Sequence, residues 1–234
     1  MNGNLTSFQL KLIAIIAMTV NHIGYIFSDK MNNPIWEFSY LFIGYLTFPI
    51  MAFFLIEGFY LTKNYYKYLL RMISFWIISI IPFALTLDNG KFNLFNNIFF
   101  VLSLGLIMIP LLEKNKDIVL KFLIVFSFTF LTSVLNSDWG LFGIPTIFAF
   151  YINKNHLINY KIKSYFQILV ILIILLVFGD ISKMLATTGL LMINPVLERY
   201  NYKKGLSNNF VKYVFYLYYP LHLILLFLIK KIIY

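Results

Sequence analysis

The feature that most limits how this chain can fold is a succession of apolar runs, each close to the length of a membrane-spanning helix. A helix needs about 20 predominantly apolar residues to cross the hydrocarbon core of a bilayer. Hydrophobic residues make up 61% of the 234 residues and charged residues 12%, against roughly 25% charged residues in soluble domains. Together with a mean hydropathy of +0.82, these runs predict an all-α, polytopic integral membrane bundle.

We expect about nine transmembrane helices in one domain that covers residues 1–234. Their expected ranges are 8–27, 35–61, 66–87, 94–112, 118–135, 139–152, 164–178, 181–195 and 211–230. The sixth, seventh and eighth runs are short, so eight or ten crossings also fit the pattern. No cleavable signal peptide is expected, because no basic segment precedes the first run and no small-residue cleavage site accompanies it.

The distribution of Lys and Arg predicts the orientation, because an excess of these residues marks the cytoplasmic side. With the N-terminus inside, 14 of the 19 basic residues fall on the inner side: Lys11, Lys63, Lys67, Arg71, Lys114, Lys116, Lys121, Lys154, Lys161, Lys163, Arg199, Lys203, Lys204 and Lys212. The outer side holds the other five, Lys30, Lys91, Lys183, Lys230 and Lys231. We therefore expect a multi-pass protein of the bacterial cytoplasmic membrane. Its net charge of +10 suits anionic lipid, and no nucleic-acid partner is expected.

Two histidines inside the apolar runs are candidate functional residues, because polar groups are costly in hydrocarbon. His22 lies beside Asn21 in the first run, and a neutral histidine can accept or donate a proton. The structural alternative is a hydrogen bond that joins two helices. His222 follows Pro220 in the last run, where the missing proline N–H interrupts the helix ladder. A packed kink with a satisfied imidazole is the alternative there.

The acidic candidates are Glu57 and Asp138. Glu57 lies toward the inner end of the second run, where a structural ion pair with Arg71 or a lysine is the alternative to a catalytic role. Asp138 follows the fifth run, on the outer side. It is a candidate catalytic carboxylate, and the alternatives are a solvated loop residue or a helix N-cap. Asp180 is a similar but weaker case.

No metal site is expected. The third histidine, His156, falls in a predicted inner loop, on the opposite side from His22, and the sequence contains no cysteine. It also lacks HxxxH and HExxH spacings, a phosphate-binding glycine loop and a GxSxG turn. Without cysteine, thiolate chemistry is excluded. The reaction type that remains is general acid–base catalysis, acting on an activated group that a co-substrate supplies.

Five blocks carry a resemblance to a known family. They are LKLIAIIAMTVNHIGYIF at 10–27, FIGYLTFPIMAFFLIEGFYLTKNYYKYLLR at 42–71, NNIFFVLSLGL at 96–106, DWGLFGI at 138–144 and KYVFYLYYPLHLILL at 212–226. In this order they resemble the TraX family, whose founding member acetylates the N-terminus of a conjugative pilin subunit. The blocks cover most of the chain and are specific only in combination.

The resemblance implies an integral membrane acyltransferase that takes acetyl from acetyl-CoA. A histidine would accept the proton of the attacking amine, and hydrogen-bond donors would stabilise the oxyanion. The catalytic residues implied are His22, Asn21, His222, Glu57 and Asp138. Those expected to bind acetyl-CoA are Arg71, Lys67 and Tyr219.

Two positions depart from the family pattern. Asn21 stands where the family usually has Asp before the histidine, and Gly44-Tyr45 stands where it usually has Gly-Arg. Both changes remove a charge from the membrane region. Asn21 could still orient the ring of His22, but it supplies no negative charge.

The expected function is therefore transfer of acetyl to an amino group, at the N-terminus of an exported or membrane-associated peptide. Acetylation of a cell-envelope sugar is the alternative within enzymes. A transporter or flippase is a different class, which broken helices and intramembrane polar groups would suit. An inactive membrane partner is a fourth hypothesis, motivated by Asn21.

Overall fold

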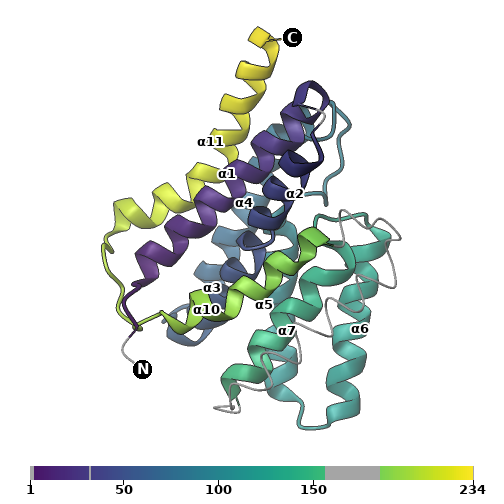
Figure 1. Cartoon of the computed structure of the whole chain (residues 1–234). Helices are drawn as coiled ribbons and strands as arrows, with labels where there is room; N and C mark the ends of the chain where they lie inside the picture. Colours follow the sequence, from purple (N-terminus) through teal and green to yellow (C-terminus); the bar gives the residue numbers. More distant parts are fainter. Residues whose placement is uncertain (1–2, 32, 156–184, 234) are drawn as a thin grey trace. The chain divides into compact units, whose positions relative to one another are not determined.

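The computed structural model describes residues 3–31, 33–155 and 185–233, and helices make up most of them (Figure 1). Within these residues there is no β-strand, although one isolated parallel bridge joins Leu5 and Tyr200. The chain divides into two compact units, Met1–Met51 with Asn159–Tyr234 and Ala52–Ile158. The all-α fold class is confirmed, and a single domain over the whole chain stays a prediction.

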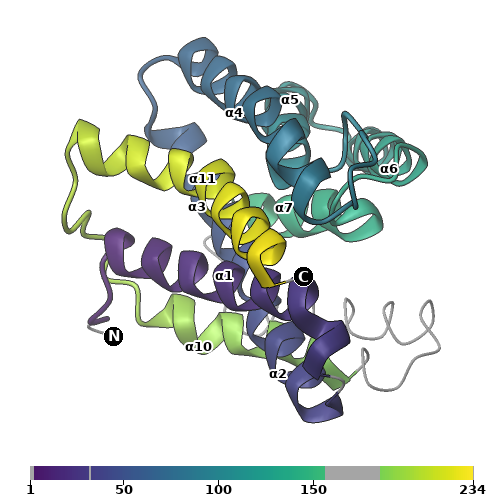
Figure 2. The ribbon, with the colours of Figure 1, turned by 90° about the horizontal axis from the view of Figure 1, so that it is seen from above.

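The first unit contains the beginning and the end of the chain. Its described elements are α1 (Ser7–Met31), α2 (Pro34–Gly44), the first turn of α3 (Thr47–Leu61), the 3₁₀ helix η1 (Thr187–Met192), α10 (Ile193–Glu198) and α11 (Asn209–Ile233). Helix α1 contacts both α2 and α11, and η1 contacts α2. Figures 1 and 2 both show α1 and α11 side by side.

The second unit contains the rest of α3 and four further helices, α4 (Tyr65–Thr86), α5 (Ile98–Lys114), α6 (Ile118–Val134) and α7 (Gly140–Asn155). Helix α5 contacts α4, α6 and α7 and supplies the fully buried side chains of Leu106, Met108, Ile109 and Leu112. A Cβ built on Gly105 would overlap the side chain of Ile147. The glycine therefore allows α5 and α7 to approach closely.

Side-chain caps explain where most of these helices begin. Asn33, Asn64, Asn97 and Asp117 each accept a hydrogen bond from a backbone N–H in the first turn of α2, α4, α5 and α6. Such caps satisfy donors that the helix itself leaves unpaired. The cap at Asn97 also explains why α5 starts four residues after the predicted start at residue 94.

The predicted span 35–61 corresponds to the apolar segment Pro34–Leu61, which is long enough to cross a membrane and is interrupted shortly before Pro49. The structure has α2 and α3, separated at Tyr45 and Leu46. Proline has no N–H for the carbonyl four residues earlier, and the carbonyl four residues before Pro49 belongs to Tyr45. The break therefore falls where the helix ladder lacks a donor.

Four helices of the described chain are long and apolar enough to cross a membrane: Ser7–Ser28, Pro34–Leu61 (with the break just described), Tyr65–Thr86 and Asn209–Ile233. The apolar helices at Ile118–Val134 and Gly140–Ile152 are shorter. The predicted span 164–178 and the start of 181–195 lie outside the described residues, as do His156 and Asp180. The described part of 181–195 forms η1 and α10, which are short. Membrane-spanning helices are confirmed, and the number nine stays a prediction.

Helices α1 and α11 run in the same direction. Phe8 of α1 contacts Phe215, and further along both helices His22 contacts His222. Backbone N–H groups of Ser7 and Phe8 donate to the carbonyls of Lys203 and Lys204, just before α11. The starts of the two helices therefore lie together. If both helices cross the membrane, the chain makes an odd number of crossings, which nine satisfies and eight or ten does not.

Candidate functional site

Two of the candidate residues meet across the contact between α1 and α11. His22 Nδ1 lies 2.8 Å from His222 Nε2, and the two rings are stacked with 6° between their planes. His22 lies about 22 Å along α1 from Ser7, at a rise of about 1.5 Å per residue, and within the segment Ser7–Ser28 that is long and apolar enough to cross a membrane. Residues 200 positions apart in sequence thus form one polar pair between two helices that are long and apolar enough to cross a membrane.

The hydrogen-bond partners of the pair determine which ring nitrogens carry protons. His222 Nδ1 lies 2.9 Å from the carbonyl oxygen of Tyr218, and a carbonyl oxygen can only accept. His222 Nδ1–H is therefore the donor, and in the neutral ring Nε2 is the acceptor. His22 Nδ1–H must then donate to that Nε2. The remaining nitrogen, His22 Nε2, carries the lone pair, so it is the atom that can accept a proton.

Aromatic side chains surround the two histidines. The ring of Tyr218 stacks on His222, with 5.1 Å between ring centroids. The ring of Tyr219 approaches both histidines at steep angles, 5.7 Å from His222 and 6.2 Å from His22. His222 is buried, with 6% of its surface exposed, whereas His22 is partly exposed. The accessible member of the pair is thus the one whose Nε2 has the lone pair.

The bend in α11 belongs to this site. Pro220 lies inside the helix between the two tyrosines and His222, and Figure 1 shows α11 changing direction along its length. A proline inside a helix kinks it by removing one ladder hydrogen bond. The histidine that follows this proline, His222, therefore has the histidine of α1 as its partner.

Asn21 contacts α2 and has no hydrogen bond to the ring of His22. Its Nδ2 donates to the carbonyl oxygen of Tyr40 over 3.1 Å, and a Cβ built on Gly44 would overlap the Asn21 amide. The expectation that Asn21 orients His22 is corrected, because consecutive residues on a helix point about 100° apart. The ring of His22 is held by His222 instead.

The other candidates, Glu57, Lys67, Arg71 and Asp138, all belong to the second unit. Glu57 lies on α3 and is partly buried. The Arg71 guanidinium lies over the ring of Tyr68, with 5.2 Å to the ring centroid, a geometry typical of cation–π attraction. Lys67 is exposed in the first turn of α4. Their catalytic and donor-binding roles stay predictions.

Asp138 lies in the loop between α6 and α7 rather than in a helix. Burial raises the pKa of its carboxyl to about 6, the backbone N–H of Trp139 acts in the opposite sense, and the charge of Asp88 raises it further. The folded protein therefore binds this proton more tightly than the unfolded chain, whose carboxyl pKa is near 3.8.

This linkage predicts a pH-dependent stability. The stabilising effect of protonated Asp138 is complete below pH 4 and is lost as pH rises toward 6. Asp138→Asn should therefore raise the unfolding temperature at pH 7.5 and change it little at pH 4. Thermal unfolding of both proteins in detergent at the two pH values would measure this. A variant that is less stable than the parent at pH 7.5 would contradict the assignment.

Thr19 and Tyr218 are further neighbours of the site, and of the two the sequence patterns did not single out Thr19. Their hydroxyl oxygens lie 2.7 Å apart, one helical turn from the histidine pair. Their spacing from the histidines, three residues on α1 and four on α11, is the signal that could have identified them, because such positions share a helix face. Among the described residues, no group of three or more His, Cys, Asp or Glu could hold a metal ion.

The comparisons with known proteins agree with the blocks quoted above. The family model described as "TraX protein" matches residues 7–230. A relative from Dichelobacter nodosus, "Probable fimbrial assembly protein FimC, serogroup H1", is 30% identical over 243 residues that cover 96% of each chain. No solved structure matches the chain. Since the family model matches residues 7–230, which include both His22 and His222, the protein belongs to the TraX family.

Proposed function

We propose that this protein is an integral membrane N-acetyltransferase that transfers acetyl from acetyl-CoA to the N-terminal amine of an exported or membrane-associated peptide. The observation that carries the proposal is the His22–His222 pair, which leaves an imidazole lone pair inside a membrane bundle of the TraX family. Placing a pair of polar rings in hydrocarbon is costly in free energy, and a role in proton transfer would explain why the protein has them there.

The proposed reaction uses the pair as follows. The neutral amine attacks the thioester carbonyl carbon, the N–C bond forms and the C–S bond breaks. His22 Nε2 accepts the amine proton, and His22 Nδ1–H can pass its own proton to His222 Nε2. Coenzyme A leaves as a thiolate and takes up a proton to become the thiol. Because both nitrogens of His222 already have partners, it suits the role of second proton carrier better than that of oxyanion donor.

The fimbrial relative favours a protein acceptor over an envelope sugar. Its printed name refers to fimbrial assembly, and fimbriae are built from protein subunits. A subunit of an exported filament would present an N-terminal amine after processing. We therefore place an exported filament subunit first among acceptors, with a glycan amine or hydroxyl as the competing class.

Acetyl-CoA is proposed to bind with help from Arg71 and Lys67, which belong to α4 near its N-terminal end. Guanidinium and ammonium groups suit the phosphates of coenzyme A. Tyr219 belongs to the first unit, against both histidines, and its expected role in donor binding stays a prediction. Arg71→Ala should raise the KM for acetyl-CoA more than it lowers kcat, because it removes binding rather than chemistry. Lys91→Ala, in the loop between α4 and α5, is the control. An unchanged KM in folded Arg71→Ala protein would count against this role.

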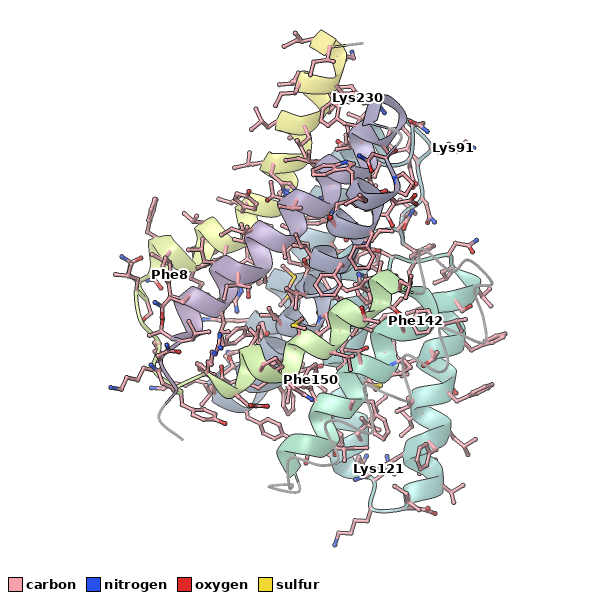
Figure 3. The ribbon with its side chains drawn as sticks, viewed as in Figure 1. Phe8, Lys91, Lys121, Phe142, Phe150 and Lys230 are labelled. Atoms are coloured by element: carbon pink, nitrogen blue, oxygen red, sulfur yellow. The ribbon has the colours of Figure 1, made fainter. Side chains whose placement is uncertain are left out.

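For localisation, we propose the cytoplasmic membrane with the N-terminus inside. Five of the inner basic residues, Lys11, Arg199, Lys203, Lys204 and Lys212, lie near the joined starts of α1 and α11. Lys230 lies near the far end of α11, and Lys91 and Lys121 lie at opposite ends of the second unit (Figure 3). This distribution supports the orientation that the charge count predicts.

The orientation can be tested by labelling single cysteines, since the chain has none of its own. A cysteine at position 32 should react with an impermeant reagent applied from outside, and one at Asn155 should react only after permeabilisation. The reverse result would contradict the proposed orientation.

The proposed activity is tested with purified protein in lipid nanodiscs and labelled acetyl-CoA. Transfer to a peptide with a free N-terminus, and none to the same peptide with a blocked N-terminus, is the expected result. Mass spectrometry of exported peptides and glycans, with and without the gene, identifies the natural acceptor. Acetylated glycan alone would favour the sugar alternative, and donor binding without turnover would favour an inactive partner.

A further inference from the structure

A second hydrogen bond joins α1 and α11 one turn before the histidine pair. Thr19 Oγ1 lies 2.7 Å from the Tyr218 hydroxyl and 2.8 Å from the carbonyl oxygen of Ile15. The carbonyl can only accept, so the single proton of Thr19 is directed to Ile15. The Tyr218 O–H therefore donates to Thr19 Oγ1, and this bond anchors the tyrosine of α11 on α1.

Tyr218 in turn contacts His222 twice. Its ring stacks on the imidazole with 11° between the planes, and its carbonyl oxygen accepts the His222 Nδ1–H. One residue therefore fixes both the plane of the His222 ring and the nitrogen that carries its proton.

We infer that Thr19 and Tyr218 are positioning residues, which hold His222 in its Nδ1–H form and thereby keep the lone pair on His22 Nε2. In the other neutral form His222 carries its proton on Nε2 and would donate to His22 Nδ1. His22 would then carry its own proton on Nε2, where it could not accept one. The position of one proton on His222 thus decides whether His22 can act as a base.

Nitrogen-15 NMR tests this inference without requiring any activity. The chain has three histidines, so ¹⁵N-histidine labelling and His→Gln variants assign every ring nitrogen, and protonated and unprotonated nitrogens differ in chemical shift. We expect one form in the parent protein, with Nδ1–H on both His22 and His222. Tyr218→Phe removes the hydrogen bond that anchors the stacked ring on α1. The imidazole can then turn so that Nδ1 no longer faces the Tyr218 carbonyl, and both forms of His222 should appear.

Matched variants distinguish the loss of the Thr19–Tyr218 hydrogen bond from the general effect of replacing a hydroxyl side chain. Thr19→Val should reproduce the mixture seen with Tyr218→Phe, and Thr19→Ser should restore one form. Tyr213→Phe on the exposed part of α11 and Thr129→Val, whose hydroxyl bonds the carbonyl of Val125, should leave the spectrum unchanged. A single form of His222 in Tyr218→Phe and Thr19→Val would overturn the inference.

A kinetic test of the same inference depends on the proposed function, because it measures acetyl transfer. Tyr218→Phe should lower kcat roughly three- to tenfold, the usual weight of one hydrogen bond, with KM for acetyl-CoA unchanged. In a His222→Ala background the same change should have no further effect, whereas a structural role would be additive. Additive effects would overturn the inference. If the parent protein transfers no acetyl, the proposed function fails, and the NMR spectra still decide the inference.

Discussion

His22→Ala is expected to lower the rate of acetyl transfer by about 10²–10⁴-fold, the usual contribution of a general base. The variant removes the lone pair at Nε2, which is the only unengaged nitrogen of the pair in the tautomers that the hydrogen bonds require. His222→Ala should have the next largest effect, because it removes the acceptor of His22 Nδ1–H and leaves the base without its orienting partner. Single-turnover assays with labelled acetyl-CoA would measure both changes.

His22→Gln distinguishes a base from a structural contact. A glutamine amide can still donate to His222 Nε2 across the two helices, but it cannot accept the proton of an amine. If His22→Gln folds and is as inactive as His22→Ala, the histidine acts as a base. If both variants fold and transfer acetyl at nearly the parent rate, His22 only joins the helices, and the catalytic proposal fails. His156→Gln is the matched histidine control.

A second large effect is expected when charges are placed on the contact between α1 and α2. Asn21→Asp removes the amide that donates to the Tyr40 carbonyl and places a carboxylate in the membrane, where a central charge costs about 2.5–3.5 kcal/mol. The variant should therefore be clearly less stable than the parent. Its effect should appear in stability before it appears in catalysis, because Asn21 contacts α2 and not the ring of His22.

Tyr45→Arg should reverse part of this loss. Asn21 lies against Gly44, next to Tyr45, so the two departures from the TraX pattern lie on either side of one helix contact. The Asp and Arg usual in the family would then be neighbours, and this chain has replaced both with uncharged residues. Each single variant should lower the unfolding temperature in nanodiscs, and the Asn21→Asp, Tyr45→Arg pair should be more stable than the sum of the single effects predicts. Additive losses would show that the two positions do not interact.

Much of the fold was predictable because its determinants are local. The length and apolarity of a run decide whether it can cross a bilayer, and α1, α4 and α11 begin and end within four residues of the ranges predicted for them. The break between α2 and α3 follows from Pro49, whose missing N–H is visible in the sequence. Asn97 likewise shows where α5 begins, once the cap is considered.

The candidate site was predictable only as a set of residue types. His22 and His222 could be selected because polar side chains in apolar runs are costly, but nothing local to either run relates residue 22 to residue 222. The partner of Asn21 was misjudged for the same reason, since adjacency in sequence was taken for contact when the helix directs the two side chains to different neighbours.

The amino-acid sequence by itself determined that this chain is helical, that it belongs in a membrane, and which few polar side chains lie in its apolar runs. Helix formation and membrane insertion depend on neighbouring residues and on the composition of each run. Only the tertiary structure decided that α1 and α11 run in the same direction, that their histidines share a hydrogen bond, and that Tyr218 fixes the proton on His222. These features depend on packing between segments about 200 residues apart, and the protonation of each ring follows from the partner that this packing supplies.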